Sequence, residues 1–287
     1  EERLVEVWNH VLKQTTIGIH DNFFEHGGDS ILSIQIVARA RTSGLELNPR
    51  DLFQHQTIAE LAQVVQPVST FEVDQGPVTG QVPLTPIQQA FFFRQPEVPW
   101  HFNQAIMLVV PVNMKEIALQ DALTTILYYH DALRLRYRHI DGNWQQCHEA
   151  VSSEKLNGKL PFHIEDLSHL SRESQAETLR DRSDFWQASL NLETGPLVRL
   201  VLFNLGDESR LLWCIHHLAV DGVSWRILIE DLHTAYHQAV SGQPVSLPAK
   251  TSSFKAWSER LVKWQESESL TIQSIIGENS VLQLHYQ

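Results

Sequence analysis

The chain has 287 residues, about twice the usual size of one domain, so its length predicts one large domain or two unequal ones. Its content of 43% hydrophobic and 20% charged residues is typical of a globular protein that can bury a core. With 22 basic against 34 acidic residues, the net charge of −12 argues against a partner with a phosphate backbone, so no nucleic acid is expected.

Two further classes of protein are excluded by simple counts. No apolar stretch approaches the roughly 20 residues of a membrane span, and the first residues lack the apolar region of a signal peptide, which predicts a cytoplasmic protein without a membrane partner. The only cysteines, Cys147 and Cys214, cannot build a disulfide scaffold or a thiolate zinc site. The chain begins in the middle of a helical pattern, as a piece of a longer protein would.

Residues 1–66 carry the pattern of a small helical bundle. Apolar residues at helical spacing predict a first helix around 4–11 and a second from 31 until Gly44 ends it, with a long loop between them. Thr57 and Glu60 have the spacing of a capping box, which predicts the start of a third helix.

The composition then changes twice. Proline, glycine and small polar residues crowd residues 67–82, which we interpret as an interdomain linker. From 83 to 287 helices and strands alternate, which predicts an α/β domain with a mixed sheet, and Asp141-Gly142 predicts a hairpin turn. The strands expected in this region are 102–110, 133–140, 143–148, 197–205 and 211–218, and the helices are 115–130, 171–190 and one from about 223.

Residues 21–30 (DNFFEHGGDS) lead into the second predicted helix. Gly27 and Gly28 allow a tight turn, and Ser30 arrives at a helix N-terminus, where free N–H groups and the helix dipole favour an anion. A serine at this position can also serve only as an N-cap. The stretch closely resembles the attachment motif of peptidyl carrier domains of nonribosomal peptide synthetases, and the resemblance covers residues 1–66.

The resemblance implies that Ser30 carries a covalent 4′-phosphopantetheine, whose thiol holds an aminoacyl or peptidyl chain as a thioester. The cofactor-binding residues are then Ser30 and Asp29. The phosphodiester would lie at the positive end of the helix, and the arm would act as a tethered group carrier. The implied partners are a phosphopantetheinyl transferase, an upstream adenylation domain, a downstream condensation domain and the thioester substrate.

Residues 216–222 (HHLAVDG) close the last predicted strand. Adjacent residues of a strand point to opposite faces, so one of His216 and His217 should be packed while the other faces a cavity. The same divergence makes a metal site a poor interpretation, and no metal is expected. The segment resembles the HHxxxDG motif of the chloramphenicol-acetyltransferase-like superfamily, which includes condensation and epimerization domains of peptide synthetases.

In that family the second histidine, His217 here, is the acid/base group in a tunnel between two lobes. The resemblance therefore implies a catalytic motif of His217, His216 and Asp221, in which Asp221 is mainly structural and pairs with an arginine. An arginine in 134–136 is the expected partner, although the two arginines there can equally be solvated charges on a strand face. The residues expected to support the motif are Gly222, Arg134 and Arg136.

Three features favour epimerization over condensation. Residues 101–104 look like the HFNQ signature of epimerization domains, residues 220–226 match their version of the histidine motif, and Asp29 before Ser30 is usual in carriers that feed them. The resemblance thus implies an isomerase-type reaction, L-to-D inversion at Cα of the carrier-bound thioester, with His217 as an acid or base near neutral pH. Two alternatives stay open: a condensation domain that forms peptide bonds, and a half-domain that only docks partners.

The resemblance ends before the chain does. It holds to about Trp264, and residues 265–287 no longer look like the family. The second lobe of an epimerization domain, with a glutamate thought to be the other catalytic group, is not found. We therefore expect an N-terminal lobe that is truncated and, because one lobe cannot enclose a tunnel, a chain that does not epimerize by itself.

Overall fold

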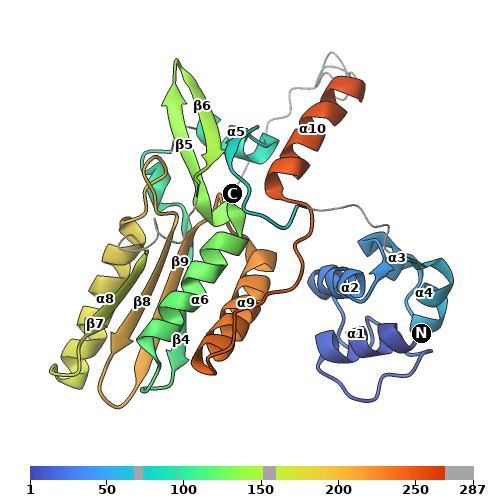
Figure 1. Cartoon of the computed structure of the whole chain (residues 1–287), viewed down its shortest axis with the longest axis horizontal. Coiled ribbons are helices and arrows are strands. Elements are labelled where there is room, and N and C mark those ends of the chain that lie inside the picture. Colours follow the sequence, from blue (N-terminus) through green and yellow to red (C-terminus); the bar gives the residue numbers. More distant parts are fainter. Residues whose placement is uncertain (68–73, 95, 151–159, 269–287) are drawn as a thin grey trace, which may run out of the picture. The chain divides into compact units, whose positions relative to one another are not determined.

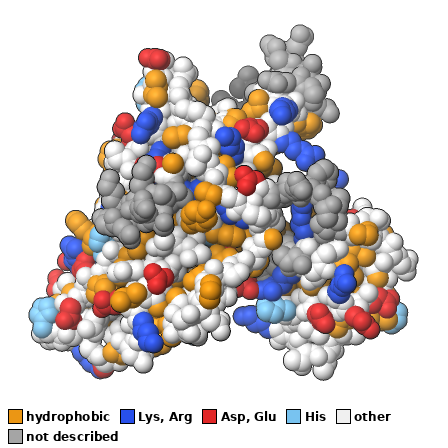
Figure 2. All heavy atoms as spheres, in the orientation of Figure 1, with side chains coloured by type: hydrophobic (Ala, Val, Ile, Leu, Met, Phe, Trp, Pro, Cys, Tyr) orange, Lys and Arg blue, Asp and Glu red, His pale blue; other side chains and the backbone are white. Residues whose placement is uncertain are grey.

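The computed structural model describes residues 1–67, 74–94, 96–150 and 160–268. It divides the chain into two compact units, Glu1–Asp74 and Gln75–Gln287, shown in Figure 1. None of the helices in the described part of the chain has the length and apolarity needed to span a bilayer. On the face shown in Figure 2, acidic and basic side chains are intermixed on both units instead of being separated by sign.

The first unit is a helical bundle around one apolar core. Its core residues include Leu4, Trp8, Phe23 and Ile36, all fully buried, and the three helices expected from the sequence contribute to it. The capping box at Thr57 is present, because its hydroxyl accepts from Glu60 N and the Glu60 carboxylate accepts from Thr57 N. The helices are α1 (Glu2–Leu12), α2 (Ser30–Thr42), α3 (Pro49–Gln54) and α4 (Ile58–Val64), and a short antiparallel pair joins β1 (Leu45–Glu46) to β2 (Gln66–Pro67).

The second unit is built on a four-stranded mixed sheet with helices on both faces. The strand order is β4 (Asn103–Val110), β9 (Ser209–His216), β8 (Val198–Asn204) and β7 (Phe162–Asp166), with only the β8–β7 pair parallel. Helices α6 (Glu116–Tyr129) and α9 (Gly222–Val240) share one core with the sheet, and α8 (Arg172–Ala188) contributes to a second core on the sheet (Figure 1). Strand β9 is covered on both faces, which explains its nearly continuous apolar sequence.

A three-stranded sheet in the same unit corrects one expectation. It has the order β3 (Gly80–Val82), β6 (Asn143–His148) and β5 (Leu135–Ile140), with the expected turn at Asp141-Gly142, where both φ angles are positive. Strand β3 lies in the stretch interpreted as a linker, so that interpretation is wrong for residues 80–82. The remaining helices of the described residues are α5 (Pro86–Phe93), the single turns η1 (Pro99–His101) and η2 (Asp131–Arg134), and α10 (Phe254–Glu268). The predicted atypical tail lies mostly outside the described residues.

A buried cluster of charges fastens two distant segments to the start of β5. Asp131 and Arg134 pair at 2.7 Å, and Lys250 lies 3.6 Å from the second oxygen of Asp131. The backbone of Val78 completes the cluster: its N–H donates to Asp131 at 3.0 Å, and its carbonyl accepts from Arg134 at 3.0 Å. Val78 therefore belongs to the second unit, although it lies in a stretch whose composition is typical of a linker.

Candidate functional site

Ser30 is the exposed first residue of α2. The residue before it, Asp29, is the N-cap, and one oxygen of its carboxylate accepts from Ile31 N at 2.8 Å and Leu32 N at 2.7 Å. The serine hydroxyl is therefore not the cap and is available at the surface. The expected anion site is altered by this arrangement, because the carboxylate of Asp29 already occupies two of the N–H groups on which a phosphodiester could rest.

The two glycines before this helix have different tasks. Gly27 adopts a φ of +89°, which disfavours residues with a side chain, and Gly28 donates its N–H to the carbonyl of Phe23 at 2.9 Å. A Cβ on Gly28 would lie 2.5 Å from the ring and the carbonyl oxygen of Phe23. The turn before Ser30 thus depends on glycine at both positions, as the sequence indicated.

His216 is fully buried at the end of β9. Its Nε2 donates to the carbonyl of Pro99 at 2.8 Å, and its Nδ1 accepts from Leu218 N at 3.1 Å, so both ring nitrogens are used in the neutral form. Burial lowers the pKa of His216 to about 4, helped by His217 and opposed by the bond to Pro99. His216 is thus the packed histidine of the pair, and its contacts indicate a structural role.

His217 follows the strand and is half-buried. Its backbone N–H donates to the carbonyl of Phe102 at 2.8 Å, and the ring of Phe102 stacks on its imidazole with centroids 4.9 Å apart. Its Nδ1 lies 2.8 Å from the carbonyl of Val220 and donates to it, because a carbonyl can only accept. The ring is therefore fixed in the tautomer that leaves a lone pair on Nε2.

The opposite nitrogen of His217 meets Gln104, a residue of β4. The amide nitrogen of Gln104 lies 3.3 Å from Nε2 of His217, and the amide oxygen accepts from the indole N–H of Trp225 at 2.8 Å. Trp225 lies on α9 and was expected only as a core residue of that helix. Gln104 and Trp225 each belong to a signature that favours epimerization, but no sequence pattern indicates that their side chains touch.

Asn103 beside Gln104 has a different contact. Its side-chain amide donates to the carbonyl of Gln187 at 2.8 Å, which ties β4 to the C-terminal end of α8. Of the two amide side chains in the HFNQ stretch, Gln104 is therefore the one that contacts the catalytic candidate His217.

The predicted ion pair of Asp221 is wrong. Asp221 is the N-cap of α9, and one oxygen of its carboxylate accepts from Val223 N, Ser224 N and the Ser224 hydroxyl. Burial opposes its ionisation, but these hydrogen bonds from Ser224 and Val223 prevail and lower the pKa of Asp221. The two candidate arginines have other partners among the described residues: Arg134 pairs with Asp131, and Arg136 pairs with Glu149 at 2.5 Å.

The packing around Gly222 does not show the supporting role that was expected for this residue. It is exposed as the first residue of α9, and a Cβ built on it would meet no atom of the described residues within 4 Å. Nothing in the described surroundings therefore requires glycine at this position.

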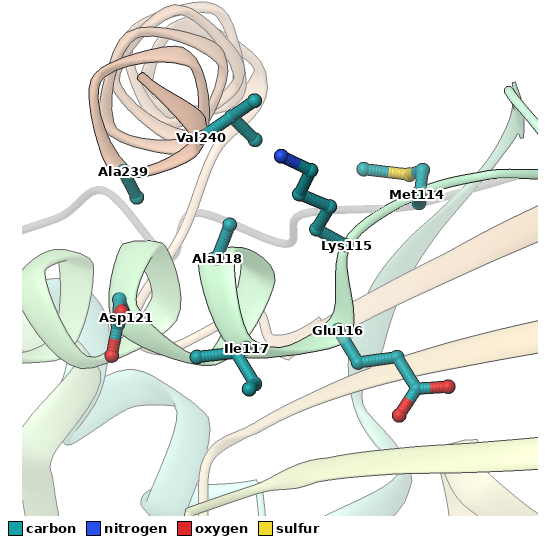
Figure 3. A pocket seen from close by; sticks show the side chains of 8 residues that line it. All are labelled: Met114, Lys115, Glu116, Ile117, Ala118, Asp121, Ala239 and Val240. Atoms are coloured by element: carbon teal, nitrogen blue, oxygen red, sulfur yellow. The ribbon is translucent and has the colours of Figure 1, made fainter. Parts of the chain in front are cut away.

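The described residues show no metal site, and the groove in the second unit lies apart from the histidine motif. Within the described ranges, no group of three or more His, Cys, Asp or Glu is arranged to hold a metal ion. A groove of about 520 Å³ lies between the N-terminal end of α6 and the C-terminal end of α9, and Figure 3 shows Lys115 reaching toward Val240 across it. No residue of the histidine motif lines this groove.

Two family models match this chain. Residues 78–274 match the family described as "Condensation domain", and residues 2–65 match "Phosphopantetheine attachment site". The chain belongs to the condensation-domain family. The match extends past residue 265, where the resemblance was expected to end.

Curated relatives are large synthetases. A component of the linear gramicidin synthase of Brevibacillus parabrevis is 50% identical over 274 residues, which cover 95% of this chain and 5% of that protein. Tyrocidine synthase 1 of the same organism is 40% identical over 270 residues, which cover 94% of this chain and 24% of that protein. The chain is thus a nonribosomal peptide synthetase segment, a phosphopantetheine carrier followed by a condensation-type domain, and spans only a small part of these relatives' length.

Solved structures support the same fold. The epimerization domain from the third module of tyrocidine synthetase B aligns with a TM-score of 0.64 at 39% identity, over 74% of this chain and 47% of that one. The starter condensation domain of rhizomide synthetase aligns with a TM-score of 0.52 at 18% identity, over 68% and 46%, and shows the fold alone. The chain covers about half the length of each.

Proposed function

We propose that the chain holds an aminoacyl or peptidyl thioester on a phosphopantetheine attached to Ser30 and takes part in L-to-D inversion at its Cα. The observation that carries the choice of inversion is the contact between the two signatures typical of epimerization domains. Gln104 of the first signature contacts Trp225 of the second, and it also contacts His217 of the shared histidine motif. The 39% identity to an epimerization domain of tyrocidine synthetase B supports the same choice.

The surroundings of Ser30 fit a tethered cofactor. The hydroxyl is exposed and is not used as a cap, and Asp29 holds the first turn of the helix in its place. Three large apolar side chains of the same unit are also exposed, and an apolar surface of this kind suits docking against partner domains. They are Ile31, 38% exposed, Ile34, 40%, and Phe53, 47%.

The surroundings of His217 fit proton transfer. When bound, the phosphopantetheine supplies the thiol that holds the amino acid as a thioester, whose carbonyl makes the Cα proton acidic. Nε2 of His217 carries the lone pair, which faces the amide nitrogen of Gln104 at 3.3 Å. It accepts the Cα proton when the substrate replaces that contact, while the carbonyl of Val220 stabilises the resulting positive charge at Nδ1–H. Inversion then requires a second group that delivers a proton to the opposite face of Cα.

A second function, peptide-bond formation, is supported by the match of residues 78–274 to the condensation family. In that reaction His217 would accept a proton from the attacking amine instead of from Cα. The two reactions differ in what happens to the Cα proton, so isotope exchange separates them.

The test uses the chain extended by the second half of an epimerization domain, loaded with an L-aminoacyl phosphopantetheine in deuterated water. Incorporation of deuterium at Cα together with the D-amino acid is expected. Retention of the Cα proton, with a peptide formed once an acceptor carrier is added, would instead establish condensation.

A further inference from the structure

A relay of hydrogen bonds crosses the histidine site from β4 to α9. It runs from the indole N–H of Trp225 to the amide oxygen of Gln104, from the amide nitrogen of Gln104 to Nε2 of His217, and from Nδ1 of His217 to the carbonyl of Val220. Gln104 and His217 are half-buried, and Trp225 is 8% exposed. The relay is therefore largely protected from competition by water.

The donor at one end of the relay and the acceptor at the other fix the direction of each hydrogen bond between them. An indole N–H can only donate, so the atom of Gln104 that faces Trp225 must be the oxygen, and the NH₂ group must face His217. A carbonyl can only accept, so the proton of the neutral imidazole must lie on Nδ1, toward Val220. Nε2 of His217 is then an acceptor that faces a donor.

We propose that Gln104 is a positioning residue for His217, and that its amide N–H, aimed by Trp225, keeps Nε2 of His217 free of a proton in the resting site. The positioning role of Gln104 rests on the proposed function only in one consequence, which is that His217 begins the reaction as the proton acceptor. Two other titratable groups lie near the ring. His216 is buried and neutral, and the carboxylate of Asp221 accepts the N–H groups at the start of α9.

Protonation of Nε2 disturbs the relay at both bonds of Gln104. A second imidazole proton would face the N–H of the amide, and two donors in contact repel each other. Rotation of the amide would present its oxygen to Nε2, but it would also turn the NH₂ group against the indole N–H of Trp225. With Nε2 protonated, neither orientation of the Gln104 amide therefore satisfies both His217 and Trp225.

The experiment is ¹⁵N NMR of the histidine rings in the 287-residue chain, which reports the protonation of each ring nitrogen without any turnover. The native chain at pH 7 should show His217 with a proton on Nδ1 and an accepting Nε2. The substitution Gln104→Glu keeps an oxygen for Trp225 and puts another opposite Nε2. It should raise the ratio of doubly to singly protonated His217 about tenfold or more, the effect of one charge-assisted hydrogen bond.

Two tryptophan variants provide a matched pair. Trp225→Phe keeps an aromatic ring but removes the donor that orients Gln104, and it should move the Nε2 signal of His217 in the direction of Gln104→Glu. Trp213→Phe is the control, since the indole N–H of Trp213 is buried without a hydrogen-bond partner among the described residues, and its ring lies only 5.4 Å from that of Trp225. This control should leave the signal unchanged.

Unchanged protonation of His217 in Gln104→Glu, or equal responses of the two tryptophan variants, would overturn the positioning role. The proposed function fails separately, if the extended chain shows no exchange at Cα while the relay behaves as expected. In that extended chain, Gln104→Glu should lower the exchange rate mainly through kcat and move the acid limb of its pH profile to higher pH. A purely structural defect would not move the pH profile.

Discussion

The helices α2 and α9 begin in the same way at the two places where chemistry is expected. Asp29 has a φ of −137° and a ψ of 179°, Asp221 has −138° and −179°, and each uses one carboxylate oxygen to accept the N–H groups two and three residues ahead. The residue after the cap differs: Ser30 presents a hydroxyl at the surface, whereas Gly222 presents nothing.

The cap is common to both helices, and the two groups proposed to react lie on opposite sides of it: Ser30 after the first cap and His217 before the second. In the first unit the reactive group follows the cap, so the cap leaves the serine free. In the second unit the reactive group precedes the cap, because Asp221 begins α9 directly after Val220, whose carbonyl holds Nδ1 of His217. The following predictions alter residues beside the two caps and then the caps themselves.

The largest effect is expected at Ser30. Ser30→Ala should abolish attachment of phosphopantetheine by a transferase with coenzyme A, because the variant lacks the hydroxyl that follows the first cap, and intact-mass analysis should show no added arm. The comparison becomes sharper with Ser30→Ala combined with Gly222→Ser, which places a serine after the second cap where a Cβ meets no obstacle among the described residues. Attachment to that second serine would mean that the cap itself is the recognised feature.

His217→Ala should slow exchange of the Cα proton by about 10² to 10⁴-fold in the extended chain, the usual contribution of a general acid–base group. The melting temperature should stay nearly unchanged, because His217 is only half-buried. Equal exchange rates in the native chain and the variant would rule out His217 as the acid/base group.

His216 should make the stability of the second unit depend on pH. Its pKa is lowered to about 4 in the folded state by burial, against about 6.5 when unfolded. Between these values the unfolded state binds more protons, so the stabilisation is complete above pH 6.5 and is lost as the pH falls to 4. The loss should be on the order of 3 kcal/mol across this window.

Urea unfolding at several pH values checks this dependence. His216→Asn should be less stable at pH 7 but should lose less stability on acidification. Some dependence will persist, because burial also lowers the pKa of His148 and of His163. Parallel curves for the native chain and the variant would contradict the buried neutral role of His216.

The smallest effects are expected at the caps themselves. Asp29→Ala and Asp221→Ala should each lower the unfolding free energy of their own unit by about 1 kcal/mol, and asparagine at either position should restore most of it. The loss should be somewhat larger at Asp221, which also accepts the hydroxyl of Ser224 at 2.7 Å. A loss of several kcal/mol at Asp221 would revive the buried ion pair that the described residues do not contain.

Much of this arrangement could be predicted from the sequence because it depends on local signals. The turn at Gly27-Gly28, the hairpin at Asp141-Gly142 and the alternation of strands and helices follow from backbone preference and hydrophobic period. The helix α3 was missed because six residues are too few to show a period, and β3 because its three residues lie among prolines and glycines.

The partner of Asp221 was predicted wrongly for a different reason. Its position directly before a helix is typical of an N-cap, whereas the resemblance to a family with an aspartate–arginine pair favoured an arginine partner. The relay from Trp225 to His217 could not be derived, because pattern and period do not reveal which side chains of β4 and α9 meet across the sheet.

The cluster around Asp131 limits where the chain can be divided. A fragment that begins at Pro83, where the prolines and glycines end, would lack the backbone of Val78 that both Asp131 and Arg134 bind. Buried charges that lose their partners are costly, so such a fragment should be poorly stable and prone to aggregate. A fragment that begins at Gln75 retains Val78 together with the bonds of Gln75 to Lys250. The stretch that resembles a linker thus joins the segment around Asp131 to the segment around Lys250 within the second unit.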